Sequence, residues 1–324
     1  MTKTLYIARP PLITDIRRVS GSTDTGVTLT LPQMSKNTSP DSQVTISVSD
    51  SPLQNPERVI AALIAYPYGC IEQTISSTLP NAIAISLGSA PGIKVDTITA
   101  KKNLEAGVEK ILKMQDASGG WKYWENDTSP NAHITPYVIR SLYEFRTLGV
   151  QIPDDVISRG LNYISTISVT DDADSRAEIF ATLASTKHPR TDEMGNYIDI
   201  KKLSRHGYLM YSVGLASLGR LDATTKQSLK SRMSSRNSES YWYWDDTADL
   251  SIYARLLGQT GERDAAANIV SELLRGVDLE SYFISTQARI QLLMTLISLS
   301  SASDRLSSID IATGKLKIPV RVAK

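Results

Sequence analysis

Cysteine and histidine are scarce in this sequence, which has one cysteine, Cys70, and three histidines among 324 residues. One cysteine excludes an internal disulfide, so Cys70 is either a small buried apolar residue or a reactive group. No apolar run approaches the roughly 18 residues that cross a bilayer, and the N-terminus lacks the apolar segment of a signal peptide. We therefore expect a cytoplasmic protein or a piece of a longer secreted chain.

A large net charge is also absent. The 35 Lys and Arg residues nearly balance the 34 Asp and Glu residues, for a formal net charge of +1, which favours neither a nucleic-acid partner nor a membrane surface. Hydrophobic residues at 41% and charged residues at 21% are typical of a soluble globular protein with a core. The length allows about two domains, or one large domain with appendages.

Hydrophobic periodicity changes twice along the chain. Val27–Leu31 and Val44–Val48 alternate apolar and polar residues, which predicts β-strands, and Leu316–Val322 predicts a final strand. Between them apolar residues recur at helical spacing, and glycines stand where helices should stop. The predicted helices cover Arg58–Tyr66, Cys70–Leu87, Thr97–Gln115, Ile134–Leu148, Asp154–Ile167, Ser175–Ser185, Gly207–Leu218, Ala223–Ser234, Thr247–Gln259, Arg263–Arg275 and Thr286–Ser300.

This order indicates a mainly α fold in which a helical domain is inserted into a β-rich region. We expect the helical domain to cover residues 53–303 and the β-rich region to consist of residues 1–52 and 304–324, since the ends of a domain usually lie close together. Aromatic turns recur between the helices, as in GGWKYW at Gly119–Trp124. Helix pairs joined by such turns favour an α/α toroid, with an inner and an outer ring of helices.

The segment that carries chemistry is YPYGCIEQ, residues 66–73. Cys70 and Gln73 are three residues apart, so at the start of a helix their side chains lie on one face, within bonding reach. Attack of the Cys70 thiolate on the Gln73 side-chain amide would expel ammonia and leave a thioester, which is an activated acyl group. Gly69 lets the chain approach closely because it has no Cβ.

A thioester must be protected from water until it is used. The sequence offers many aromatic side chains for such a cover, although each of them could equally pack between helices. These side chains are Tyr66, Tyr68, Trp121, Tyr123, Trp124, Tyr241, Trp242, Tyr243, Trp244, Tyr282 and Phe283.

GCIEQ at Gly69–Gln73 resembles the GCxEQ thioester signature of the α2-macroglobulin and complement family, and the Tyr-Pro-Tyr before it resembles the bacterial α2-macroglobulins. Three further segments resemble the family in the expected order. They are TLPNAIA at Thr78–Ala84, ITPYV at Ile134–Val138 and STQA at Ser285–Ala288. The resemblance covers roughly residues 54–302, and an ordered set of segments is far more specific than GCxEQ alone.

The resemblance implies an α/α-toroid thioester domain inserted in a CUB-type β-sandwich, within a long multidomain chain of the bacterial cell envelope, either periplasmic or anchored to the inner membrane. It implies a broad-spectrum protease inhibitor rather than an enzyme. A protease cleaves a bait region, the protein changes shape, and a lysine amine of the protease attacks the exposed thioester. No bait region is recognisable here, so we expect the trigger in the remaining domains of the parent chain. No cofactor, metal or nucleic acid is implied.

Lysine amines are the expected nucleophiles. Complement relatives that prefer hydroxyls carry a histidine in the loop after the helix resembling Asp154–Ile167, whereas Val169–Phe180 has none. Residues that could assist or shield the site are Glu72, Tyr66, Tyr68, His133, Tyr282 and Gln287. Three of these have equally plain structural roles: His133 on the surface at a helix start, Glu72 in polar packing, and Gln287 as a partner of helix-end backbone groups.

Two other functions fit parts of the sequence. A thioester adhesin or a structural binding module would share the chemistry or the fold and differ in its target. An α/α-toroid enzyme such as a terpene cyclase or prenyltransferase is suggested by QDASGGW at Gln115–Trp121 and by the acidic run Asp171–Asp174. Acidic runs usually cap helices or face solvent, and the only cysteine lies in GCIEQ rather than in a zinc-ligand pattern. Turnover of an isoprenoid diphosphate would therefore be needed to support the enzyme.

Overall fold

Helices dominate the part of the chain that the computed structural model describes, which comprises residues 46–48, 67–87, 96–166, 172–234, 245–276, 285–300 and 320–322. Within these residues no helix is both long enough and apolar enough to cross a membrane. The elements are β1 (Ile46–Val48), α2 (Ile71–Leu87), α3 (Thr97–Lys113), α4 (Thr135–Thr147), α5 (Asp154–Thr166), α6 (Ala173–Ser185), α7 (Thr191–Asn196), the 3-10 helix η1 (Ile200–Lys202), α8 (Arg205–Ser217), α9 (Ala223–Ser234), α10 (Asp246–Gln259), α11 (Arg263–Gly276), α12 (Thr286–Ser300) and β2 (Val320–Val322).

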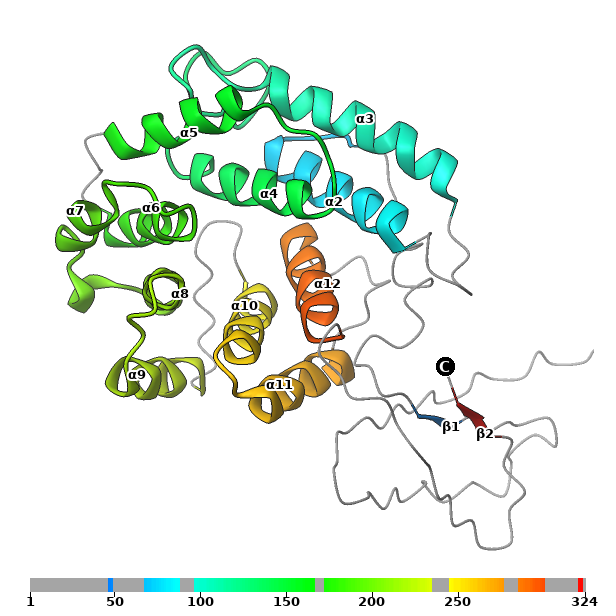
Figure 1. Ribbon diagram of the computed structural model, residues 1–324, viewed down its shortest axis with the longest axis vertical. Helices are drawn as coiled ribbons and strands as arrows, with labels where there is room; N and C mark the ends of the chain where they lie inside the picture. Colours follow the sequence, from blue (N-terminus) through cyan, green and yellow to red (C-terminus); the bar gives the residue numbers. More distant parts are fainter. Residues whose placement is uncertain are drawn as a thin grey trace, which may run out of the picture.

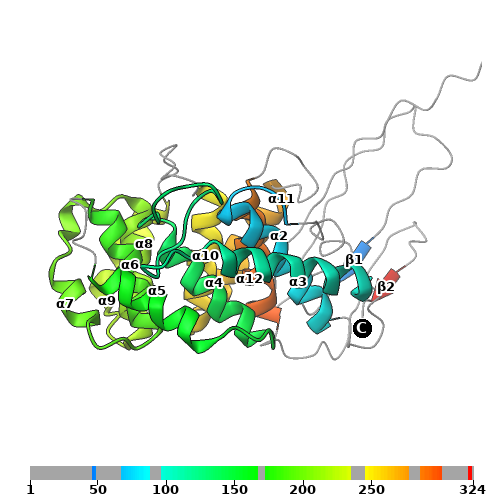
Figure 2. The same ribbon diagram turned by 90° about the horizontal axis from the view of Figure 1, so that it is seen from above.

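The even-numbered helices form a closed inner ring. Helix α2 contacts α4, α4 contacts α6, and the contacts continue through α8, α10 and α12 back to α2. The odd-numbered helices α3, α5, α7, α9 and α11 each pack against the even-numbered helix before them and lie outside the ring. Figure 1 shows the ring face-on, and Figure 2 shows it turned by 90°. The predicted mainly α fold and its toroid are thus confirmed.

One apolar core runs through the helices. On α2, Ile71 and Ile75 are fully buried, as their helical spacing predicts. Trp121, in the turn after α3, is also fully buried, and its indole N–H donates to the Ile111 carbonyl at 2.9 Å. The first aromatic turn therefore anchors in the core through Trp121, while Trp124 remains 52% exposed.

Helix limits agree with the predicted ones to within about two residues wherever the structure describes them. Gly149, Gly219 and Gly261 follow α4, α8 and α10 with φ values of +84°, +69° and +89°, which confirms them as glycines that end helices. Two elements were not predicted, α7 and η1, which lie in the connection between α6 and α8. Both are too short for hydrophobic periodicity to be recognisable.

The two short strands β1 and β2 pair in parallel, with Ile46 opposite Val320, and both lie within segments predicted as strands. The pairing joins a segment that precedes the helices to one that follows them. The predicted strand Val27–Leu31, the predicted helix Arg58–Tyr66 and the predicted domain limits near residues 52 and 303 lie outside the described residues.

Candidate functional site

Cys70 and Gln73 meet at the start of α2. Cys70 is the residue before the helix, and its carbonyl accepts the first helical hydrogen bond, from the Thr74 N–H at 2.9 Å. The Gln73 side chain turns back, and its Oε1 accepts a hydrogen bond from the Cys70 backbone N–H at 3.2 Å. This is the return half of a capping box, in which the third helical residue caps the residue before the helix. The amide that a thiol would attack is thus held against Cys70.

Gly69 permits this return of the Gln73 side chain. Its φ of +96° lies in the region that favours glycine, and a Cβ built on it would lie 2.0 Å from Gln73 Oε1. Cys70 is 3% exposed, whereas Gln73 is exposed. Cys70 is therefore buried at the start of α2, whereas Gln73 lies at the surface.

The aromatic turn after α3 contacts the start of α2. The Tyr123 carbonyl accepts a hydrogen bond from the Ile71 N–H at 2.9 Å, one of the helix-start donors that no helical carbonyl can satisfy. The Tyr123 hydroxyl hydrogen-bonds Cys70. Burial, this contact and the nearby charge of Glu72 raise the pKa of the phenol above its usual value. The phenol therefore stays protonated near neutral pH and can donate to a sulfur anion.

Glu72 links the last helix of the ring to the first. It is 5% exposed, and its carboxylate accepts hydrogen bonds from Ser76 at 2.7 Å and from Thr286 on α12 at 3.0 Å. Burial raises the pKa of this carboxyl, and the two hydroxyls offset part of the shift. The GCIEQ and STQA segments, more than two hundred residues apart, thus meet through Glu72 and Thr286.

Among the other residues expected to assist or shield Cys70, one is buried, one is exposed and two lie outside the described residues. Gln287, next to Thr286, is 1% exposed, and within the described part of the chain its amide nitrogen and oxygen have no hydrogen-bond partner. Tyr68 is 75% exposed. Tyr66 and Tyr282 lie outside the described residues. A shielding role for these side chains stays a prediction.

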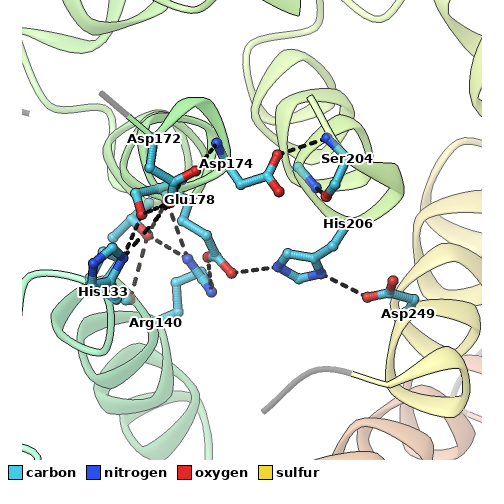
Figure 3. Close-up of polar contacts among 12 residues, drawn as sticks. His133, Arg140, Asp172, Asp174, Glu178, Ser204, His206 and Asp249 are labelled. Carbon is cyan, nitrogen blue, oxygen red and sulfur yellow. Dashed lines mark hydrogen bonds and ion pairs between the residues drawn. The ribbon is translucent and has the colours of Figure 1, made fainter. Parts of the chain in front are cut away.

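His133 precedes α4 and contacts the start of α6 (Figure 3). Its Nδ1 lies 2.5 Å from Ser175 Oγ, and the Ser175 hydroxyl also lies 2.5 Å from Asp172 Oδ2. Asp172 caps α6 by accepting from backbone N–H groups of its first turn, and Asp174 accepts from the Ser204 N–H at 2.9 Å. These two carboxylates of the acidic run therefore bind backbone N–H groups, as helix caps do.

A buried ionic chain joins α4, α6, α8 and α10 (Figure 3). His206 is 2% exposed, with Nε2 at 2.7 Å from Glu178 Oε1 and Nδ1 at 2.7 Å from Asp249 Oδ1. Glu178 in turn pairs with Arg140 at 2.5 Å. Because both ring nitrogens face carboxylate oxygens, which only accept hydrogen bonds, the imidazolium form of His206 fits this site.

Burial and pairing have opposite effects on the charges of this chain. Burial alone would lower the pKa of His206, but Asp249 and Glu178 outweigh it and raise the pKa to about 9. Burial alone would raise the pKa of Glu178, but Arg140 and His206 outweigh it and lower the pKa to about 2. Arg140, Glu178 and His206 therefore carry alternating charges near neutral pH.

Polar side chains also bridge the remaining junctions of the inner ring. Tyr137 on α4 hydrogen-bonds Ser76 on α2, and Arg255 on α10 donates to Gln291 on α12 at 2.8 Å. The contact of Glu72 with α12 completes the set. Each pair of neighbouring inner helices is thus tied by a specific polar contact, and the start of α2 is fixed within the ring.

The His206 chain could not be predicted from the sequence. His206 lies at the start of α8, but Glu178 and Asp249 lie 28 and 43 residues away, so no local spacing connects the three. The available signal was a charged residue in the otherwise apolar stripes of two predicted helices, since such residues are rarely buried without a partner.

Comparisons with known proteins agree with this architecture. The family model described as "A-macroglobulin TED domain" matches residues 43–172. The α2-macroglobulin of Escherichia coli is 34% identical over 115 residues, which make up 35% of this chain and 7% of that protein. The native conformation of the same E. coli protein superposes with a TM-score of 0.62 at 23% identity, over 78% of this chain and 17% of that one. Salmonella α2-macroglobulin reacted with methylamine gives a TM-score of 0.61 at 23% identity, over 80% and 18% of the two chains.

The family match makes residues 43–172 similar to the TED domain of macroglobulins, and the closed toroid and the GCIEQ turn at the head of α2 agree with that likeness. The relatives that match by sequence over about a third of this chain are bacterial α2-macroglobulins. The chain spans only a small part of the relatives it matches, 7% of the E. coli protein. The structural likeness, at 23% identity, shows the fold alone.

Proposed function

We propose that Cys70 and Gln73 form an internal thioester that captures an attacking protease through one of its lysine amines. One observation carries this proposal: Gln73 Oε1 sits on the Cys70 backbone N–H at 3.2 Å. A glutamine elsewhere on α2 would have no reason to return to the residue before the helix. This hydrogen bond holds the Gln73 side-chain amide against the backbone of Cys70, and Cys70 carries the only thiol of the sequence.

The thioester would form by attack of Cys70 Sγ on Gln73 Cδ. The negative charge that develops on Oε1 is stabilised by the Cys70 N–H already bonded to it and by the positive end of α2. The C–N bond then breaks, and the nitrogen leaves as ammonia with the proton that came from the thiol. The product joins Gln73 Cδ to Cys70 Sγ.

Capture reverses the role of the sulfur. A lysine amine attacks Gln73 Cδ, an amide bond forms, and the electron pair of the broken C–S bond leaves on Cys70 Sγ. The proton that the amine loses goes to solvent or to the thiolate. The Tyr123 hydroxyl, which hydrogen-bonds Cys70, would stabilise the departing sulfur anion. Each chain reacts once, so the protein acts as a stoichiometric inhibitor rather than as an enzyme with turnover.

Amines are the favoured targets. A relative with the same fold, the Salmonella α2-macroglobulin, has been crystallised after reaction with methylamine, and methylamine shares the reactive group of a lysine side chain. The lack of histidine in Val169–Phe180 supports the same preference. Hydroxyl groups are weaker nucleophiles and need a base to remove their proton.

We propose that the capture chemistry lies in this chain and that its trigger lies in the rest of a parent α2-macroglobulin. We place the bait region in the remaining domains of that parent, and its location in the bacterial envelope, periplasmic or anchored to the inner membrane. The parallel pairing of β1 with β2 supports a CUB-like β-sandwich, built from the segments on either side of the toroid. Such an insertion would leave the two ends of the toroid together.

The test is covalent capture of a protease by the freshly purified chain. Trypsin with its active site blocked by a small inhibitor supplies surface lysines without degrading the chain. We expect a product that survives denaturant and thiol reductant, with one peptide joining Gln73 to a trypsin lysine. Trypsin with methylated lysines is the matched target, and Cys70→Ala is the matched chain. Absence of the product with wild type, or equal yield with Cys70→Ala, would refute the proposal.

A further inference from the structure

A lysine side chain holds the turn that precedes Cys70. Lys110 lies on α3, and its Nζ donates to the Gly69 carbonyl at 2.8 Å and to the Pro67 carbonyl at 3.3 Å. The two carbonyls are more than forty residues away along the sequence. Lys110 thus joins α3 to the short segment that leads into the GCIEQ turn.

Lys110 binds backbone carbonyl oxygens rather than a carboxylate. Its neighbour Lys113, one turn further along α3, pairs with Glu125 at 2.7 Å. Lys110 has no carboxylate within ion-pair distance in the part of the chain that the structure describes. Its ammonium instead binds two backbone oxygens. A charged donor gives stronger hydrogen bonds than a neutral one, so these two contacts fix the turn more firmly than an amide or hydroxyl would.

Helix α3, which carries Lys110, packs tightly against α2. Gly107, three residues before Lys110, packs so closely on α2 that a Cβ there would lie 2.0 Å from Thr78 Oγ1. On the other side of the turn, the Tyr123 carbonyl holds the Ile71 N–H at 2.9 Å. Helix α3 and the turn after it therefore fix the chain on both sides of Cys70. Lys110 binds the residues before Cys70, and the Tyr123 carbonyl binds the residue after it.

We propose that Lys110 is a positioning residue for the thioester. It holds Pro67–Gly69 in place, so that the side-chain oxygen of Gln73 keeps its hydrogen bond with the Cys70 N–H. Gly69 has a left-handed φ of +96°, and the Gln73 side chain packs directly against it. A glycine can leave that conformation easily, and the bond from Lys110 to its carbonyl opposes this. The inference rests on the proposed thioester and adds the residue that controls how readily it forms and how long it lasts.

Lys110→Met should loosen the turn without removing the apolar stem of the side chain. Because small misplacements at a reacting centre cost large factors in rate, we expect the half-life of the thioester in amine-free buffer to fall about 10-fold or more. Lys110→Arg keeps a charged donor and should stay within about 3-fold of wild type. Lys113→Met removes a lysine from the same helix face and should change nothing, since its exposed ion pair contributes little. The half-life is followed by release of the Cys70 thiol.

A half-life for Lys110→Met equal to that of wild type would overturn the inference, as would failure of Lys110→Arg to restore it. A second measurement separates this outcome from failure of the thioester itself. If wild type carries no thioester, hydrogen exchange of the Cys70 amide and iodoacetamide alkylation of its thiol still report on the turn. Lys110→Met should then raise both rates about 10-fold, because the turn opens more often, and unchanged rates would sink the positioning role. Unfolding midpoints check that each variant folds.

Discussion

Replacing His206 by leucine is expected to lower the free energy of unfolding by about 3–5 kcal/mol. The substitution removes the cation that Glu178 and Asp249 share, at a position that is 2% exposed. Glu178 keeps its pair with Arg140, but Asp249 is left as a buried carboxylate without its partner. Denaturant unfolding followed by circular dichroism measures the change.

This effect depends on pH with a definite sign. His206 has a folded pKa of about 9, raised from 6.5, so the stability that its charge contributes is complete below pH 6.5 and lost as pH rises through about 9. Glu178 has a folded pKa of about 2, lowered from 4.5, so its contribution is complete above pH 4.5 and lost as pH falls toward 2. Both contributions are therefore complete between pH 4.5 and 6.5.

The difference between wild type and His206→Leu should accordingly shrink as pH rises from about 6 to about 10. His188→Leu is the control, since His188 is only partly buried and accepts one bond, from the Arg190 N–H at 3.3 Å. It should cost about 1 kcal/mol. Adding Asp249→Leu to His206→Leu removes the orphaned carboxylate, so the double variant should lose less stability than the two single losses combined. A pH-independent loss, or one no larger than that of His188→Leu, would contradict the ionic account.

Replacing Gly69 by alanine is expected to reduce methylamine incorporation at Gln73 by about 100-fold or more. The new Cβ would lie 2.0 Å from Gln73 Oε1 and 2.9 Å from its Cδ, so the side chain must leave the Cys70 N–H. The φ of +96° adds backbone strain of about 1–3 kcal/mol for any residue with a Cβ. The substitution should therefore slow the reaction strongly while leaving the toroid folded.

Gly261→Ala separates the two effects of this substitution. Gly261 has a similar φ of +89°, but a Cβ there meets nothing within 4 Å. It should cost comparable stability and leave methylamine incorporation unchanged. Mass spectrometry of the Gln73 peptide after a timed exposure to methylamine gives the rate. Gly69→Ala reacting at the wild-type rate would show that the return of the Gln73 side chain is irrelevant to the reaction.

The fold was largely predictable because each helix carries its own periodic signal. Helix α9 and helix α12 have the predicted limits, and Gly149, Gly219 and Gly261 end helices as expected. Hydrophobic spacing is local, so a single sequence suffices to read it. The proximity of Cys70 and Gln73 was predictable for the same reason, since three residues at a helix start leave few arrangements open.

Contacts between distant segments could not be predicted in this way. Lys110 reaches Gly69 across 41 residues, and Thr286 reaches Glu72 across 214. Such contacts depend on how α3 and α12 pack against α2, and the sequence contains no spacing that encodes the packing. Glu72 illustrates the difference. Its position in GCIEQ marks it as part of the candidate site, but only the structure shows that its carboxylate accepts a hydrogen bond from Thr286 on α12.

The intact mass of the freshly purified chain, measured before and after methylamine, tests the central claim most directly. We predict a mass lower than that of the sequence by one ammonia and no titratable thiol at first. Methylamine should then add its own mass to Gln73 and release the Cys70 thiol, and Cys70→Ala should do neither. A starting mass equal to that of the sequence, with a free thiol and no uptake of methylamine, would contradict the thioester.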